Sequence, residues 1–190
     1  MKKFLGLTLL FFTLSFFAQK QRALYVKGNA LFLPVGILNA GLEYQLSTHY
    51  TAQADFLISP WKSFAGSHAQ IFMGHLEGRY YFNEAFKHWY VGGNIGSAIY
   101  DIQKYNYIGT NLYQRGFNIM AGATVGYQMK WKENWNIDFY IGGGNSQGFY
   151  HGYKTIAPNI VVRYDGANKW NKSGEWIPYR GGIMIAYKLK

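Results

Sequence analysis

Residues 37–46 read Ile-Leu-Asn-Ala-Gly-Leu-Glu-Tyr-Gln-Leu, and this stretch indicates the fold. Its even positions are apolar and carry Leu38, Ala40, Leu42, Tyr44 and Leu46. Its odd positions are mostly polar or small and carry Ile37, Asn39, Gly41, Glu43 and Gln45. A period of two separates these sets onto opposite faces of an extended strand, which a helix with its period of about 3.6 does not do. The stretch therefore predicts a β-strand.

The same alternation continues along most of the chain. In residues 69–82, Phe72, Leu76 and Tyr80 share one face, whereas Glu77 and Arg79 share the other. The pattern predicts eight strands at about residues 22–32, 37–47, 49–59, 69–83, 88–101, 116–130, 134–150 and 178–189.

The connections between these strands alternate in length. Short ones are expected at residues 47–48, 83–87 and 131–133, and long ones at 60–68, 102–115 and 151–177. The link at 33–36 is tight. This asymmetry is typical of an all-β, eight-stranded antiparallel up-and-down transmembrane β-barrel. Its termini and short turns would be periplasmic, and its long loops would be extracellular, in the outer membrane of the cell.

The N-terminus has the pattern of an export signal. Lys2 and Lys3 precede an uncharged, mainly apolar run at residues 4–18, which is shorter than the roughly 20 residues a spanning helix needs. We expect residues 1–18 to be a signal peptide and residues 19–190 to form a single outer-membrane β-barrel domain.

The composition limits the chemistry of the chain. Charged residues make up 15% of the 190 residues, against about 25% in typical soluble domains, so part of the surface is expected to face something other than water. The absence of cysteine excludes disulfides, a thiol nucleophile and zinc–thiolate sites.

Alternation alone fits both a membrane barrel and a soluble lipocalin-like barrel, which differ in the direction of the apolar face. Aromatic residues of that face gather near the short turns and predict a membrane-interface girdle of Tyr44, Tyr50, Tyr80, Trp89, Tyr127, Trp135 and Tyr187, together with Phe82. A second belt near the other end is expected from Phe32, Phe56, Phe72, Phe117 and Tyr179.

The polar face carries balanced charge. Lys27, Arg79, Arg180 and Lys188 stand against Glu43, Asp55, Glu77 and Asp138. Such a balance suits an enclosed lumen, where an unpaired charge is costly. We predict a lumenal polar network of Lys27, Glu43, Asp55, His75, Glu77, Arg79, Asp138 and Arg180. Glycines on the same face, including Gly122, Gly126 and Gly182, would relieve crowding in a narrow barrel.

Several stretches carry a family resemblance. They are residues 39–44 (Asn-Ala-Gly-Leu-Glu-Tyr), 75–82 (His-Leu-Glu-Gly-Arg-Tyr-Tyr-Phe), 122–127 (Gly-Ala-Thr-Val-Gly-Tyr) and 182–187 (Gly-Ile-Met-Ile-Ala-Tyr). On these motifs the chain resembles a family of uncharacterised Gram-negative outer-membrane β-barrel proteins, defined as a domain of unknown function. The resemblance implies the barrel fold over most of residues 22–189 and carries over no catalytic residue.

An enzymatic alternative is a lipid A deacylase-like hydrolase, which needs a serine, a histidine and an orienting carboxylate. The candidates are Ser97, His88, Ser146, His151, Asp101 and Glu175, and they form no recognisable triad. The five histidines lack metal-ligand spacing. We therefore assign no catalytic residue, no metal and no cofactor, and expect a protein that is not an enzyme.

The long loops carry an excess of positive charge. Lys62, Lys104, Arg115, Lys154, Arg163, Lys169 and Lys172 against Asp165 and Glu175 give seven minus two, or net +5. The expected partners are outer-membrane lipid, including lipopolysaccharide phosphates, and not nucleic acid. The predicted function is that of a monomeric barrel with a closed polar lumen and a structural or surface-interaction role. The alternatives are the lipid-modifying enzyme and a soluble lipid-binding barrel.

Overall fold

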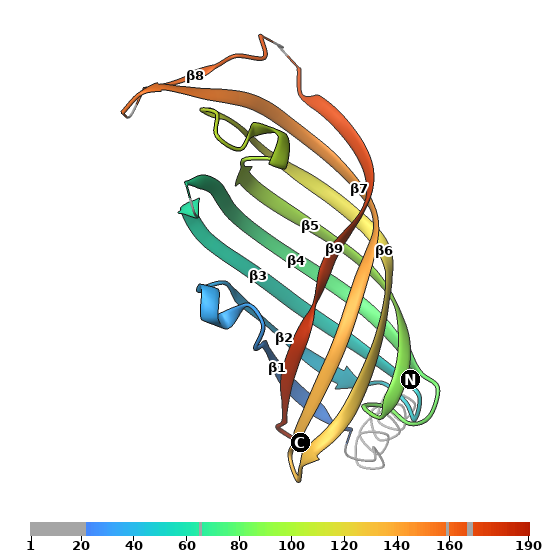
Figure 1. Ribbon diagram of the computed structural model, residues 1–190. Helices are drawn as coiled ribbons and strands as arrows, with labels where there is room; N and C mark the ends of the chain where they lie inside the picture. The colour runs from blue at the N-terminus through green and yellow to red at the C-terminus, as the bar shows by residue number, and fades with distance from the viewer. Residues whose placement is uncertain (1–21, 65, 159, 167–168) are drawn as a thin grey trace, which may run out of the picture.

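The computed structural model describes residues 22–64, 66–158, 160–166 and 169–190 (Figure 1). The predicted signal peptide lies outside these residues. Within these residues there are two single-turn 3-10 helices, η1 (Leu33–Val35) and η2 (Tyr105–Tyr107). In the described part of the chain, no helix has the length and apolarity needed to cross a membrane. The strands are β1 (Leu24–Asn29), β2 (Leu38–Gln45), β3 (Tyr50–Phe64), β4 (Ser67–Tyr81), β5 (His88–Ile102), β6 (Leu112–Lys132), β7 (Trp135–Ala157), β8 (Ile160–Arg163) and β9 (Asn171–Lys188).

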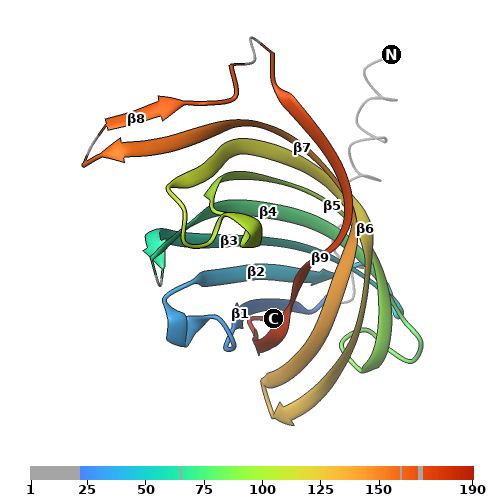
Figure 2. The same ribbon diagram turned by 45° about the horizontal axis from the view of Figure 1, so that its top comes forward.

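The strands form one antiparallel sheet that closes on itself. Its order is β6-β5-β4-β3-β2-β1-β9-β7-β8, and a further pairing of β6 with β7 closes a ring of eight strands. Strand β8 pairs with β7 beyond the ring, as the views in Figures 1 and 2 show. The predicted all-β class, the antiparallel pairing and the eight-stranded closure are thus confirmed.

The wall of the ring is uneven in height. Strands β1 and β2 have 6 and 8 residues, whereas β6 and β7 have 21 and 23. The short strands lie on the low side of the ring and the long ones rise on the other (Figure 1). The sequence-based boundaries were wrong here, since β9 begins at Asn171 and not at 178, and much of the expected loop at 151–177 is strand. Backbone pairing between β7 and β9 continues as far as Tyr150 and Asn171, which extends both strands.

The side chains alternate between the two faces of the wall as expected. Glu43 and Arg79 are 0% and 1% exposed, whereas Leu42 and Tyr80 are 50% and 36% exposed. The polar face therefore lines the interior of the ring and the apolar face forms its outer surface.

A bulge in β9 changes the alternation at one point. Gly142 pairs with Arg180 and Gly143 with Pro178, so Tyr179 is the extra residue. Its hydroxyl donates to Asn94 Oδ1 at 2.6 Å, and its ring stacks on His75 with centroids 5.6 Å apart. The prediction that Tyr179 belongs to the apolar belt was wrong, because the bulge turns it toward the interior beside Arg180.

Candidate functional site

The interior of the ring holds a connected set of buried ionic side chains centred on Arg79 of β4. Arg79 Nη1 lies 3.2 Å from Glu43 Oε2 and 2.9 Å from Asp138 Oδ2. Its Nη2 and Nε donate to Glu77 Oε2 at 2.9 and 3.0 Å. Strands β2, β4 and β7 are therefore joined across the interior through one guanidinium.

Lys27 of β1 completes this group. Its Nζ lies 2.7 Å from Asp138 Oδ2 and also contacts Glu43. Two hydroxyls add hydrogen bonds, since Tyr90 donates to Asp138 Oδ1 at 2.8 Å and Thr51 donates to Glu43 Oε1 at 2.6 Å. Because a buried charge is costly unless it is paired and hydrogen-bonded, this dense pairing is what makes the charged interior tenable.

A second group lies next to the first. Arg180 Nη2 reaches Asp55 Oδ2 at 2.7 Å and Glu77 Oε2 at 3.2 Å. His75 Nδ1 lies 3.6 Å from Asp55 Oδ1, on the other oxygen of the same carboxylate. Glu77 contacts both Arg79 and Arg180 and so links the two groups into one interior network.

All eight residues predicted for the polar lumen lie in this network and are at most 9% exposed, namely Lys27, Glu43, Asp55, His75, Glu77, Arg79, Asp138 and Arg180. Lys188, the fourth cation of the predicted balance, is exposed at the end of β9. The predicted equality of four cations and four carboxylates was therefore wrong. The network contains three cations, four carboxylates and His75.

Glycines make room for the interior side chains. A Cβ at Gly126 would lie 2.3 Å from the Tyr90 ring, and one at Gly182 would lie 2.3 Å from Asn29 Nδ2. Gly182 also has φ +145°, a conformation that favours glycine. Small residues at these positions permit the large polar side chains opposite them.

The turn between β4 and β5 closes the short-turn end of the ring, which sequence reasoning missed. Phe86 is 5% exposed, and its ring lies 4.4 Å from that of Tyr25. Asn136 Nδ2 donates to the Phe86 carbonyl at 3.3 Å, and Ala85 N–H donates to the Thr48 carbonyl at 2.7 Å. Phe86 has φ +68°, which is unusual for a bulky residue and leaves little sequence signal.

The predicted girdle residues lie on the outer surface near the short turns. Tyr44, Tyr50, Tyr80, Trp89, Trp135 and Tyr187 are 36% to 58% exposed, and Tyr127 is half-buried. Neighbouring strands bring them into pairs, with ring centroids 5.1 Å apart for Tyr50 and Tyr80, 5.2 Å for Trp89 and Tyr127, and 4.7 Å for Trp135 and Tyr187.

At the opposite end, the segment around η2 is tied to the tall side of the ring. Lys104 Nζ lies 3.0 Å from Glu175 Oε1 of β9, and the Tyr164 and Tyr107 hydroxyls lie 3.3 Å apart. Desolvation and this hydrogen bond raise the pKa of Tyr164 to about 12. Tyr164 therefore stays neutral and able to donate at physiological pH.

Asp165 organises the connection between β8 and β9. It lies 3.0 Å from His151 Nδ1, and it accepts from Gly152 N–H at 3.1 Å and from Arg163 Nε at 2.5 Å. Although partial desolvation acts in the other direction, these donors hold the pKa of Asp165 well below its usual range. His151 and its carboxylate thus serve to fix a connection.

The candidate catalytic residues are not brought together. Ser146 is buried and accepts a hydrogen bond from Asn118 Nδ2 at 2.9 Å, away from the His151–Asp165 pair. His88 Nδ1 meets the Tyr127 hydroxyl at 3.0 Å. Among the interactions of the described residues, Asp101 pairs with His68 and Arg115, and Glu175 pairs with Lys104. No group of three His, Asp or Glu side chains able to hold a metal ion occurs in that part of the chain.

Sequence comparison places the chain in a family. The family described as Protein of unknown function (DUF3575) matches residues 6–188. The chain belongs to this family. No significant match is found among curated proteins or solved structures. The resemblance to a family of unknown function is thereby confirmed, and the network, the turn around Phe86 and the outer aromatics all lie within the matched DUF3575 region.

Proposed function

We propose that this DUF3575 protein is an outer-membrane β-barrel with a closed polar interior, serving as a structural or surface-interaction protein. The observation that carries the proposal is the direction of the two faces. Apolar side chains such as Leu42, Ile95 and Ile141 are 50% to 61% exposed on the outside, while the ionic network is buried inside. An outer surface of this kind suits acyl chains and is poorly suited to water.

Two further features support insertion into lipid. The ring closes through β6 and β7, so its strands satisfy one another's backbone groups, as a spanning sheet requires. The outer aromatics near the short turns occupy the position of an interfacial girdle.

The side chains inside the ring favour a barrel that is closed to ions over one that conducts them. Arg79 links strands β2, β4 and β7, Lys27 adds β1, and Phe86 packs against Tyr25 at the short-turn end. Side chains therefore cross the ring at two levels. We propose that the protein does not conduct ions at rest and that its loop end carries the contacts with other molecules.

The two alternatives have less support. A soluble lipid-binding barrel needs an apolar interior, whereas the buried charged residues here line the ring. A lipid-modifying enzyme needs a serine beside a histidine, whereas Ser146 meets Asn118 and His151 meets Asp165.

Fractionation and gel migration test the proposal. The full-length chain, expressed in a Gram-negative host, should be recovered with the outer membrane, begin near residue 19 on N-terminal sequencing, and migrate differently before and after boiling. In planar bilayers it should show no steady conductance. Recovery as a detergent-independent soluble protein with unchanged migration would contradict the proposal. Altered lipid A mass spectra on expression would favour the enzyme.

A further inference from the structure

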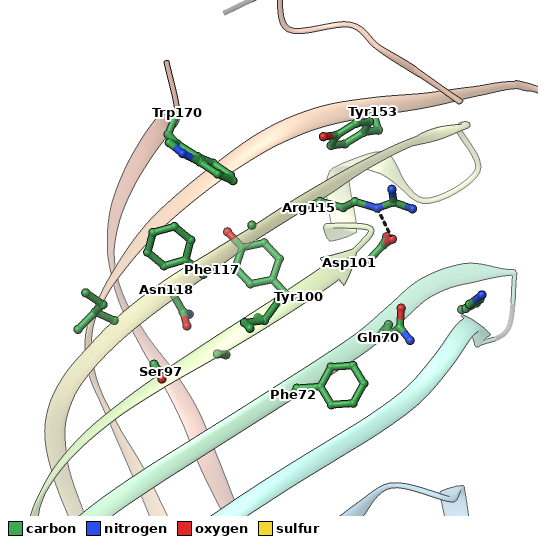
Figure 3. A pocket seen from close by; sticks show the side chains of 15 residues that line it. Gln70, Phe72, Ser97, Tyr100, Asp101, Arg115, Phe117, Asn118, Tyr153 and Trp170 are labelled. Carbon is green, nitrogen blue, oxygen red and sulfur yellow. Dashed lines mark hydrogen bonds and ion pairs between the residues drawn. The ribbon is translucent and has the colours of Figure 1, made fainter. Parts of the chain in front are cut away.

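A hollow of about 800 Å³ lies on the outer surface of β4, β5 and β6 near the loop end (Figure 3). Its apolar floor includes Phe72, Ile99 and Phe117, which are 45%, 67% and 37% exposed. Phe72 and Phe117 share the outward face of their strands with the girdle residues Tyr80 and Tyr127. The hollow is therefore open to the outside of the ring and separate from the interior network.

The hollow continues toward the middle of the wall. A second hollow of about 510 Å³ is lined by Gly74, Leu76 and Ile95, and its lining also includes Asp55 and His75 of the interior network. Both hollows include Ser97 and Ile119. Together they form one groove, which we call the β4–β6 groove. From Asp101 to Ile95 along β5 it runs about 20 Å at about 3.4 Å per residue. At a strand tilt near 45° this is about 15 Å of depth, close to half of a hydrocarbon core of about 30 Å.

The loop end of the groove carries positive charge. Arg115 donates through Nε to Asp101 Oδ2 at 2.6 Å (Figure 3), and its guanidinium carbon lies 5.2 Å from the centroid of the Tyr153 ring. The side chain is 51% exposed, so its charge is accessible from outside. Lys62 lines the same end. Asp101 is also contacted by His68 Nδ1 at 2.8 Å, so this carboxylate fixes Arg115 in place. Two cations against one carboxylate leave a net positive rim.

A tryptophan forms the side of the groove at this end. The Trp170 ring meets that of Phe117 edge to face, with centroids 5.6 Å apart, and stacks on His151 at 4.4 Å. Tryptophan favours the level of lipid head groups, where one part of the ring is apolar and the other wet. The groove thus combines an apolar floor one leaflet deep with a cationic, aromatic rim.

We propose that the β4–β6 groove binds one anionic phospholipid of the surrounding outer leaflet, with the phosphate at Lys62 and Arg115 and an acyl chain along the floor as far as Gly74. This inference rests on the proposed membrane insertion. The commitment to an anionic head group follows from the net positive rim, because cations near a membrane surface favour anionic lipids. The commitment to an acyl chain follows from the length and apolarity of the floor.

The test uses the folded protein in phosphatidylcholine vesicles containing a trace of spin-labelled phosphatidylglycerol or spin-labelled phosphatidylcholine. The measured quantity is the immobilised fraction of each labelled lipid. We expect phosphatidylglycerol to be favoured about threefold or more. The double variant Lys62→Gln, Arg115→Gln should remove that preference. Lys130→Gln, at the opposite end of β6, should leave it unchanged.

A second pair of variants tests the floor. A Cβ at Gly74 would meet only the Asp55 carbonyl oxygen, at 3.8 Å, and one at Gly78 on the same strand would meet nothing within 4 Å. Both sites therefore accept a side chain, but only Gly74 lies in the groove. Gly74→Leu should lower the immobilised phosphatidylglycerol fraction about twofold or more by filling the floor, and Gly78→Leu should not.

Equal immobilisation of the two lipids, or equal behaviour of Gly74→Leu and Gly78→Leu, would overturn the proposal. Vesicle flotation of the same samples separates this failure from failure of the proposed function. Protein that floats with the vesicles but shows no lipid preference contradicts the groove alone. Protein that does not float contradicts both.

Discussion

At the residue scale, Glu77 is the carboxylate that joins Arg79 to Arg180. Glu77→Ala would leave both buried guanidinium groups with one partner fewer, and we expect a loss of about 3–5 kcal/mol in unfolding free energy. Urea unfolding of the protein in lipid vesicles measures this loss. Glu84→Ala is the matched control, because its exposed pair with Lys87 is worth at most about 1 kcal/mol. Unchanged stability and unchanged conductance in Glu77→Ala would contradict the closing role of the network.

Also at this scale, Gly126 shows how closely the interior is packed. Gly126→Ala would place a Cβ 2.3 Å from the Tyr90 ring, which binds Asp138 and lies under the Arg79 guanidinium at 4.4 Å. We expect a loss of about 1–3 kcal/mol from overpacking in the same urea experiment. Gly93→Ala on the neighbouring strand meets nothing within 4 Å and should have little effect. Equal stability of the two variants would argue against a filled interior.

At the element scale, the turn at residues 83–87 acts as a cover for the short-turn end. Phe86→Ala should lower the unfolding free energy by about 3 kcal/mol, because its ring packs on Tyr25 and Tyr81. Phe86→Leu retains most of the apolar contact and should recover more than half of that loss. Thermal unfolding followed by gel migration measures both variants. A turn that only connects β4 and β5 would tolerate alanine without loss.

Strand-level prediction from the sequence succeeded where the alternation was regular. In β2 and in residues 75–80 of β4, apolar or small residues alternate with polar or small ones, so the buried Glu43, Glu77 and Arg79 could be assigned to one face. It failed in β9, because the bulge adds Tyr179 as an extra residue. The alternation of inward and outward side chains is therefore reversed between the part of β9 before Tyr179 and the part after it. The alternation on each side of such a bulge predicts its own short strand, so one long strand with a bulge is not recognised as a single element.

Contacts made by the connections between strands were beyond sequence reasoning. The pairing of His151 with Asp165 depends on how the β8–β9 connection folds back, and the inward position of Phe86 depends on a positive φ. Neither feature can be recognised in the sequence, because residues in connections lack the two-residue alternation by which strands are predicted. The interior network was predictable because its members share a face on strands that must pair.

At the scale of the whole molecule, an outer face in contact with lipid predicts that an isoleucine-to-arginine substitution lowers the free energy of unfolding more on the wall than outside it. Ile95 and Ile108 are 61% and 66% exposed, but Ile95 lies midway along β5 and Ile108 follows η2 outside the wall. In lipid, Ile95→Arg should cost about 2–4 kcal/mol of unfolding free energy. Ile108→Arg should change it by about 0.5 kcal/mol or less. Similar small effects at both sites would indicate that water, and not lipid, surrounds the wall.

The unequal strand lengths make the open end slanted, with β1 and β2 as its lower lip and β6 and β7 as its upper one. The two sides of this opening therefore differ, because the wall is low at β1 and β2 and high at β6 and β7. If the ring is inserted in a membrane as proposed, a bulky molecule moving parallel to the membrane would meet a lower wall on the side of β1 and β2 and the outer face of a taller sheet on the side of β6 and β7. Under the proposed insertion, the direction of approach as well as the chemistry of a molecule would decide which contacts it makes at the open end.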